Sequence, residues 1–135
     1  MLRKLTHTKH AGFTLVEIMI VVAIIALLAA IAVPNFLRSR KRSQATAILE
    51  DLRIIDSAVD QYAIENNKSG GFGPVGWDDI QKYVKTGTRL YTSGGTDILG
   101  NGFTLPTVDS APRVNSSTYT ALPDVAPARL WPPYN

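Results

Sequence analysis

Few residues of this chain could do chemistry, and Glu17 is the most unusual of them. It lies in the stretch GFTLVEIMIVVAIIALLAAIAVP, residues 12–34, and carries the only charge between Ala11 and Leu37. A carboxylate on an apolar helix costs about 2.5–3.5 kcal/mol at the centre of a bilayer, so such a residue usually has a partner. Glu17 is therefore either an acid of the first helical turn that reaches the headgroups, or a charge that requires a cation.

The other residue types exclude most enzyme chemistry. The chain has no cysteine, and its two histidines, His7 and His10, lie in the first twelve residues. Disulfides, thiolate metal sites and, after residue 12, nucleophilic sites built on His or Cys are excluded. Asp78 and Asp79 are adjacent, so on a helix they point about 100° apart and form no obvious catalytic pair. We expect no catalytic residue and no metal ligand, and a small anchored or secreted enzyme or binding domain is the rival interpretation.

Positive charge is concentrated at the N-terminus. The chain has 14 Lys+Arg and 11 Asp+Glu, and Arg3, Lys4 and Lys9 precede an otherwise charge-balanced remainder. A balanced body gives no electrostatic reason to expect nucleic-acid binding. A second basic group, residues 38–42, follows the apolar stretch, so the positive-inside rule gives no orientation.

The apolar stretch has the length of a membrane span. Residues 18–33 are all apolar, and residues 13–37 would form a helix of about 37 Å, enough to cross a hydrocarbon core of about 30 Å. A secretory signal peptide with AIA at residues 30–32 as its cleavage site is one interpretation, and a retained membrane helix is the other. The run is longer than the usual 7–15 residues of a signal peptide, which favours the retained helix.

The helical pattern continues past Leu37 on one face only. The apolar residues recur every three or four positions, at Ala45, Ile48, Leu52, Ile55, Val59 and Tyr62. This spacing predicts an amphipathic helix that packs on a core, and the segment NNKSGG at residues 66–71 predicts its end. Pro34 is the only helix breaker inside the run, and we expect a kink there because proline cannot bond the carbonyl of Ala30.

The C-terminal half is rich in turns. The sequence predicts a short helix at residues 77–85, strands at residues 88–92, 103–108 and 117–122, and an irregular tail packed through Leu130, Trp131 and Tyr134. The expected fold class is α+β, with one long N-terminal helix packed on a small antiparallel β-sheet. The expected divisions are residues 1–12, 13–37, 38–67 and 68–135, of which the last two form a globular head.

The sequence GFTLVE after a short basic leader, followed by an apolar helix with Pro34 seventeen residues after Glu17, resembles the type IV pilin and type II secretion pseudopilin superfamily. The resemblance covers residues 1–65. Further on, DILGNGF at residues 97–103 is similar to the Asp-Pro-Trp-Gly-Asn-Pro-Tyr signature of major pseudopilins. Asp97, Gly100 and Asn101 match this signature, Phe103 replaces one aromatic residue by another, and the positions that depart from it are Ile98, Leu99 and Gly102.

The resemblance implies a pilin-like fold and specific processing. A prepilin peptidase would remove the basic leader, residues 1–12, by cutting between Gly12 and Phe13, and the new amine of Phe13 would be N-methylated. Glu17 would then set the register of subunits during assembly, against its own amine or that of a neighbour. Pro34 would mark the place where the helix loosens in a filament.

The function that the resemblance implies is structural. The chain would be a pseudopilin of a type II secretion system that polymerises into a helical filament to drive protein export, and the alternative is a surface type IV pilin for adhesion or motility. Its partners would be copies of itself, the prepilin peptidase, the inner-membrane assembly platform and minor pseudopilins. It would span the bacterial inner membrane once with a cytoplasmic N-terminus and then form a periplasmic or extracellular filament.

Two consequences of the resemblance stay open at the level of sequence. Major pseudopilins bind a structural calcium ion in a region comparable to that of Asp109 and Asp124, but their ligand spacing is not reproduced, so no ligand is assigned and no cofactor is expected. The basic group at residues 38–42 is a solvated face, a contact for headgroups, or a contact for acids such as Glu50 and Asp51 of a neighbouring subunit.

Overall fold

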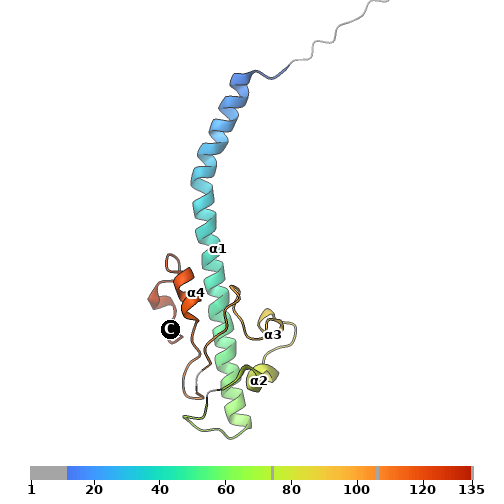
Figure 1. Ribbon diagram of the computed structural model, residues 1–135, viewed down its shortest axis with the longest axis vertical. Helices are drawn as coiled ribbons and strands as arrows, with labels where there is room; N and C mark the ends of the chain where they lie inside the picture. Colours follow the sequence, from blue (N-terminus) through green and yellow to red (C-terminus); the bar gives the residue numbers. More distant parts are fainter. Residues whose placement is uncertain (1–11, 74, 106, 135) are drawn as a thin grey trace, which may run out of the picture. The chain divides into compact units, whose positions relative to one another are not determined.

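The computed structural model describes residues 12–73, 75–105 and 107–134 (Figure 1). The leader expected at residues 1–12 lies outside this part of the chain except for Gly12. The chain divides into two compact units, with the boundary between Phe36 and Leu37. The elements in order are α1 (Leu15–Glu65), α2 (Trp77–Ile80), the 3-10 helix η1 (Gln81–Tyr83), α3 (Arg89–Thr92), α4 (Ser116–Ala121) and the 3-10 helix η2 (Ala128–Leu130).

Helix α1 joins the predicted apolar and amphipathic segments into one element of 51 residues. It ends where the sequence predicts. Asn67 has a φ of 50°, and the amide of Lys68 donates to the carbonyl of Ala63 at 2.9 Å. Asparagine tolerates this left-handed conformation, and the bond satisfies a carbonyl that the end of a helix would leave unpaired. Pro34 lies inside α1, and the kink there stays a prediction.

The core of the second unit consists of two apolar clusters along α1. The predicted stripe is confirmed, since Ala45, Ile48, Leu52, Ile55 and Val59 are buried and Tyr62 packs at the edge. The first three residues of the stripe pack with a cluster from the C-terminal segment, namely Val114, Leu122, Ala126, Trp131 and Tyr134. Ile55 and Val59 pack with the other cluster, namely Ala58, Val75, Ile80, Val84 and Leu90.

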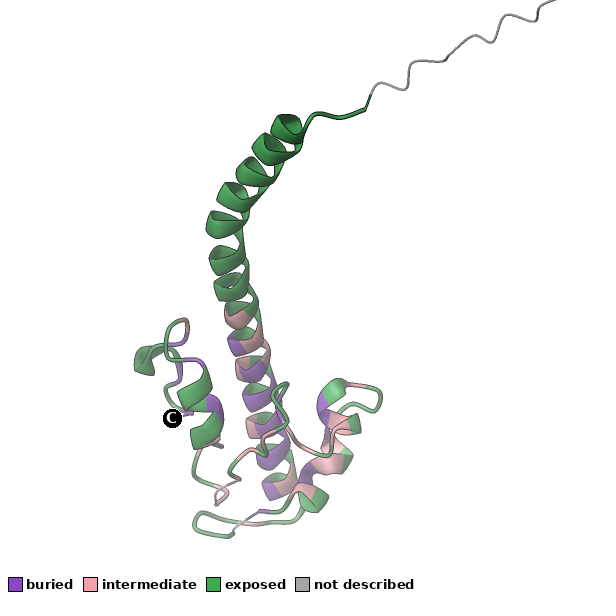
Figure 2. Ribbon diagram, turned by 45° about the horizontal axis from the view of Figure 1, so that its top comes forward, coloured by how far each residue is buried: buried purple, intermediate pink, exposed green. Residues whose placement is uncertain are grey.

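The two clusters lie on different sides of α1. Figures 1 and 2 both show α4 and the C-terminal segment on one side of the lower part of α1, and α2 and α3 on the other. Phe103 packs against both clusters and so connects them. The second unit is therefore organised around the helix, which contributes to every part of the core.

The predicted antiparallel sheet is wrong. Within the described ranges there is no strand, and only two isolated bridges pair backbone, Thr96 with Gly102 and Thr104 with Arg113. Residues 88–92 and 117–122 were expected as strands because of their β-branched and aromatic side chains. Instead they form α3 and most of α4, so the α+β class is corrected to a mostly helical one.

Side-chain capping explains why these two segments form helical turns instead of strands. The Thr88 hydroxyl accepts a hydrogen bond from the amide of Tyr91 and starts α3. The Asn115 side chain accepts one from the amide of Ser117 and starts α4. Threonine and asparagine are strong N-caps, and a capped turn that buries one side chain competes well with a strand that has no neighbour to pair with. Pro106 belongs to the remaining expected strand, residues 103–108, and lies outside the described residues.

Two smaller predictions need adjustment. The helix expected at residues 77–85 is shorter, because α2 ends at Ile80 and η1 at Tyr83. The tail packs through Trp131 and Tyr134 as expected, and the indole of Trp131 donates to the carbonyl of Ala126 at 3.1 Å. The prediction that Leu130 also anchors the tail is wrong, because its side chain is exposed.

Candidate functional site

The first turn of α1 holds Glu17 in a reciprocal capping arrangement. The amide of Thr14 donates to Glu17 Oε2 at 2.8 Å, the Thr14 hydroxyl donates to the same oxygen at 2.9 Å, and the amide of Glu17 donates to that hydroxyl at 3.2 Å. This is a capping box, in which an N-cap threonine and an acid three residues later satisfy each other's backbone amides. The structure therefore gives Glu17 a local partner in the uncleaved chain.

Thr14 is the residue of this site that the sequence analysis missed. Its signal was present in the sequence, since TLVE at residues 14–17 has the Thr-x-x-Glu spacing of a capping box before an apolar run. The amide of Thr14 belongs to the residue next to Phe13, so an amine at Phe13 would form beside the same carboxylate. The cap and the expected ionic partner are thus adjacent along the chain.

Phe13 and Glu17 lie together at the surface. They line one open hollow of about 340 Å³ with Ile18, Ile20 and Val21. The Phe13 side chain is 85% exposed, and nothing lies within 4 Å of the place where a Cβ on Gly12 would be. The peptide bond between Gly12 and Phe13 is therefore open on both sides. Their roles in cleavage and methylation stay predictions.

The rest of the first unit presents apolar side chains outwards. No residue of the best membrane-spanning window in α1 is buried, and the exposed side chains include Leu15, Ile18, Val22, Ile25, Leu28 and Ile31 (Figure 2). Burying one such side chain is worth about 1.5–3 kcal/mol, so a surface of this size in water is strongly unfavourable. Lipid or other protein chains must cover it.

The DILGNGF loop forms a buried polar network in the second unit. Asp97 is only 3% exposed, and its Oδ1 accepts hydrogen bonds from the amides of Leu99 and Asn101 at 2.8 and 2.9 Å. Its Oδ2 accepts one from the hydroxyl of Thr118 in α4, which in turn accepts one from the Asn101 side chain. Gly100 has a φ of +86°, which favours glycine. The loop positions that match the pseudopilin signature thus tie the loop to α4.

A second polar contact joins α3 to α1. Arg89 forms an ion pair with Asp51, and its other nitrogen donates to the carbonyl of Thr96 at 2.9 Å. Burial raises the pKa of Asp51, and the Arg89 guanidinium opposes that rise. A contact of the basic group at residues 38–42 with Asp51 of a neighbouring subunit was one of the alternatives left open, and this ion pair uses Asp51 inside the chain.

Asp56 lies on α1 beside the C-terminal tail. The Tyr134 hydroxyl donates to its Oδ2 at 3.4 Å, a long bond. Burial raises the pKa of Asp56, the charge of Asp60 four residues later raises it further, and the bond from Tyr134 opposes the rise. Burial also raises the pKa of Tyr134, as does the charge of Asp56.

The acids of the C-terminal half do not fit a shared calcium site. In the described part of the chain, no three side chains of His, Cys, Asp or Glu come close enough to hold a metal ion. Asp97 receives three N–H and O–H donors, Asp124 faces the Lys41 ammonium at 3.6 Å, and Asp109 packs against Gly70. Carboxylates that accept hydrogen bonds or pair with lysine are not arranged for calcium, which needs several oxygens around one point.

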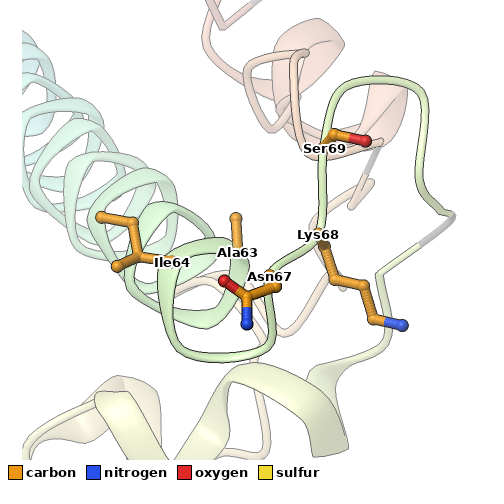
Figure 3. A pocket seen from close by; sticks show the side chains of 5 residues that line it. All are labelled: Ala63, Ile64, Asn67, Lys68 and Ser69. Carbon is orange, nitrogen blue, oxygen red and sulfur yellow. The ribbon is translucent and has the colours of Figure 1, made fainter.

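The open hollow at the end of α1 has no arrangement for catalysis. It has a volume of about 410 Å³ and is lined by Ala63, Ile64, Asn67, Lys68 and Ser69 (Figure 3). Lys68 is the only charged residue among these, and its ammonium lies 4.1 Å from the centre of the Phe72 ring. No acid or base that could act with it lines this hollow.

These features define a class of protein, one with an uncovered apolar helix that begins at a capped acid and continues into the core of a small head. Comparison with known proteins agrees. Residues 7–33 match the prokaryotic N-terminal methylation motif. This motif and the relatives named below support the superfamily of type IV pilins and type II secretion pseudopilins.

Individual relatives come from both branches of the superfamily. The chain is 33% identical over 100 residues to the type IV major pilin protein PilA of Myxococcus xanthus, an alignment that covers 74% of this chain and 46% of the relative. It is 46% identical over 56 residues to the type IV wide pilus major component PilA4 of Thermus thermophilus, which covers 42% of this chain and 43% of the relative. It is 32% identical over 60 residues to the type II secretion system core protein G of Aeromonas hydrophila, which covers 44% of this chain and 42% of the relative.

The chain thus spans less than half the length of each of these relatives. No solved structure matches the chain.

Proposed function

We propose that this chain is a structural subunit of a type IV pilus-like filament, with no reaction of its own. The observation that carries the proposal is the exposed apolar surface of α1 before Phe36. Most of the residues that form this surface lie within the match to the methylation motif, residues 7–33. In the membrane, lipid covers this surface. In the filament, the same helices of neighbouring copies replace the lipid. The exchange keeps the apolar area out of water in both states, so polymerisation exposes no apolar surface to water.

Processing prepares the helix for this exchange. The prepilin peptidase cuts between Gly12 and Phe13, and the amine of Phe13 is methylated. Glu17 then meets a cation, its own amine or that of a neighbour, and a buried carboxylate without one is costly. The need for this pair favours one axial register between subunits.

Within the superfamily we propose the pseudopilin of a type II secretion system. Several core G proteins of such systems align with this chain over about 60 residues, and the loop DILGNGF resembles the signature of the major pseudopilins. The subunit spans the inner membrane once with its N-terminus in the cytoplasm, and its partners are the peptidase, the assembly platform, minor pseudopilins and copies of itself. The filament lies in the periplasm.

A surface type IV pilin is the second candidate, and a specific observation favours it. The alignment with the Myxococcus xanthus pilin covers 100 residues and therefore extends into the head, whereas those with the core G proteins cover about 60. Deletion of the gene separates the two candidates. Loss of protein export with surface fibres intact supports the pseudopilin, and loss of surface fibres with export intact supports the pilin.

Mass spectrometry of the mature N-terminus tests the class as a whole. We expect a chain that begins with N-methylated Phe13. A mature chain that begins at Val33 would mean removal of residues 1–32 as a signal peptide, and the filament proposal would then be wrong.

A further inference from the structure

Apart from Glu17, which Thr14 caps, two acids on α1 belong to no ion pair among the described residues. The described residues form ion pairs from Glu50 to Arg53, from Asp51 to Arg89 and from Glu65 to Lys82. Asp56 and Asp60 belong to none of the ion pairs in that part of the chain. They are four residues apart, so they lie on one side of the helix and repel each other.

Arg40 is their counterpart on the opposite side of α1. It is exposed and also belongs to none of these ion pairs, whereas its neighbour Lys41 contacts Asp124. At about 100° per residue, Asp56 and Asp60 lie about 160° and 200° around the helix from Arg40. Arg40 therefore points away from the midpoint between the two acids.

The head leaves the side chains of Arg40 and Asp60 exposed. Ile48 and Val59, which are buried in the two core clusters, lie about 80° and 100° around the helix from Arg40. The buried residues of α1 extend from Ala58, at about 0°, to Ala45, at about 140° around the helix from Arg40, so the core covers the face of the helix between Arg40 and the acids. Asp60 is exposed and Asp56 is half-buried, so a neighbour can approach them.

Complementary patches on opposite sides of one element suit parallel copies. In such a contact, one surface of a copy meets a different surface of the next copy. A contact of this heterologous kind can repeat without closing, so it gives an open filament instead of a closed dimer. The midpoint of Asp56 and Asp60 is 18 residues from Arg40, which corresponds to about 27 Å along the helix. All these residues belong to the unit that starts at Leu37.

We propose that Arg40 of one copy lies between Asp56 and Asp60 of a parallel neighbouring copy that is shifted by about 27 Å along α1. This proposal rests on the proposed filament function. The partner is a second copy of this chain, and the contact adds a second marker of register to Glu17. Among the alternatives left open for the basic group, Glu50 and Asp51 are weaker acceptors, since both acids already have a cation within the chain.

Cross-linking tests the contact directly, because the chain has no cysteine. The full chain with Arg40→Cys and Asp60→Cys is assembled in cells and treated with a short bis-maleimide, since an ion pair holds Cα atoms farther apart than a disulfide allows. We expect a ladder of dimers, trimers and longer products. The matched control is Arg40→Cys with Ser57→Cys, an exposed residue at the same level of the helix but about 100° from Arg40. A ladder of equal intensity in the control, or none in the test pair, would overturn the proposal.

Charge reversal gives an independent measure. We expect Arg40→Glu and Asp60→Lys each to reduce sedimentable filament several-fold, and the double variant to recover most of it. Arg42→Glu is the control, because Arg42 lies on the same side as the acids and should leave assembly unchanged. Loss without recovery in the double variant, at unchanged thermal unfolding of the unassembled chain, would contradict the contact.

The outcomes separate this proposal from the proposed function. If the unmodified chain forms no filament, the proposed function fails. If filaments form but the test pair gives no ladder, only the contact fails. Products that stop at the dimer would indicate a closed pair of copies instead of an open head-to-tail series, and would also overturn the contact.

Discussion

At the scale of single residues, the Glu17 carboxylate has one partner before cleavage, and the proposal gives it a second partner after cleavage. In the uncleaved chain its carboxylate is satisfied by Thr14. Cleavage after Gly12, as proposed, would make an amine at Phe13 available to it, its own or that of a neighbour. The hydrogen-bonded cap and the ionic pair are different interactions, so substitutions can separate them.

We expect Glu17→Ala to be cleaved after Gly12 but not to assemble, because it removes the carboxylate that pairs with the amine. Thr14→Ala is the matched variant, which removes about 1 kcal/mol of capping and leaves the acid in place, so filaments should still form. The amount of mature chain and of sedimentable filament measures both effects. Normal assembly of cleaved Glu17→Ala would show that the acid does not set the register.

Asp56 provides a prediction about pH. Its pKa is raised in the folded chain, so its contribution to stability is fully present below the ordinary pKa of 3.8 and is lost as the pH rises through the higher folded value. We expect Asp56→Asn to stabilise the unassembled full chain in detergent at pH 7, by about 0.5 kcal/mol or less, because it removes the repulsion from Asp60. The gain should disappear near pH 3, below the ordinary pKa of 3.8, because Asp56 is then mostly protonated and carries no charge for Asp60 to repel. Thermal unfolding followed by tryptophan fluorescence at the two pH values checks this, and a larger gain at pH 3 would contradict it.

At the scale of elements, the loop at residues 97–101 and α4 depend on Asp97. One buried carboxylate satisfies two backbone amides and the Thr118 hydroxyl, and without it all three donors would be unpaired in the interior. Short helices such as α4 contribute little by themselves, so their position depends on contacts of this kind.

We expect Asp97→Ala to destabilise the head by about 3 kcal/mol or more, which the midpoint of thermal or urea unfolding measures. Asp109→Ala is the control on an exposed acid and should change the free energy of unfolding by about 0.5 kcal/mol or less. Recovery of the Asp97→Ala head by added calcium would show that the acids bind the ion after all.

Pro34 concerns α1 as an element. It leaves the carbonyl of Ala30 without its helical donor, which weakens one turn near the C-terminal end of the apolar segment. We expect Pro34→Ala to slow amide hydrogen exchange around residues 30–36 in assembled filaments. Equal exchange in the two proteins would mean that the proline does not loosen the helix.

At the scale of the whole molecule, the apolar side chains of the two units are kept out of water in different ways. The core of the second unit comes from its own chain, with Trp131 fully buried. The apolar residues of the first unit have no such core and need lipid or other copies. The two units should therefore lose structure under different conditions.

We expect Trp131→Ala to destabilise the head by about 3–5 kcal/mol, because it removes the largest side chain of the core. In detergent micelles the far-ultraviolet helical signal of the apolar segment should persist after the head has unfolded. Circular dichroism and urea titration of the full chain measure both. Loss of the whole helical signal in one step would contradict the independence of the units.

The sequence by itself determined the parts that depend on periodicity and local hydrogen bonding. The apolar span, the buried stripe from Ala45 to Val59 and the end of α1 at Asn66 and Asn67 follow from spacing and residue type along one helix. The methylation motif with Gly12, Phe13 and Glu17 is likewise a local pattern. Such features need no information about which segments meet in space.

Only the tertiary structure decided what the C-terminal half does. A strand needs a neighbour, and residues 88–92 and 117–122 instead form capped turns that place Leu90 and Thr118 in the interior. The buried network of Asp97 and the pairing of Asp51 with Arg89 depend on contacts between distant parts of the chain, as does the absence of an ion pair at Asp56 and Asp60 among the described residues. Because a side chain's partner is set by where the fold places it, residue type and spacing could not predict them.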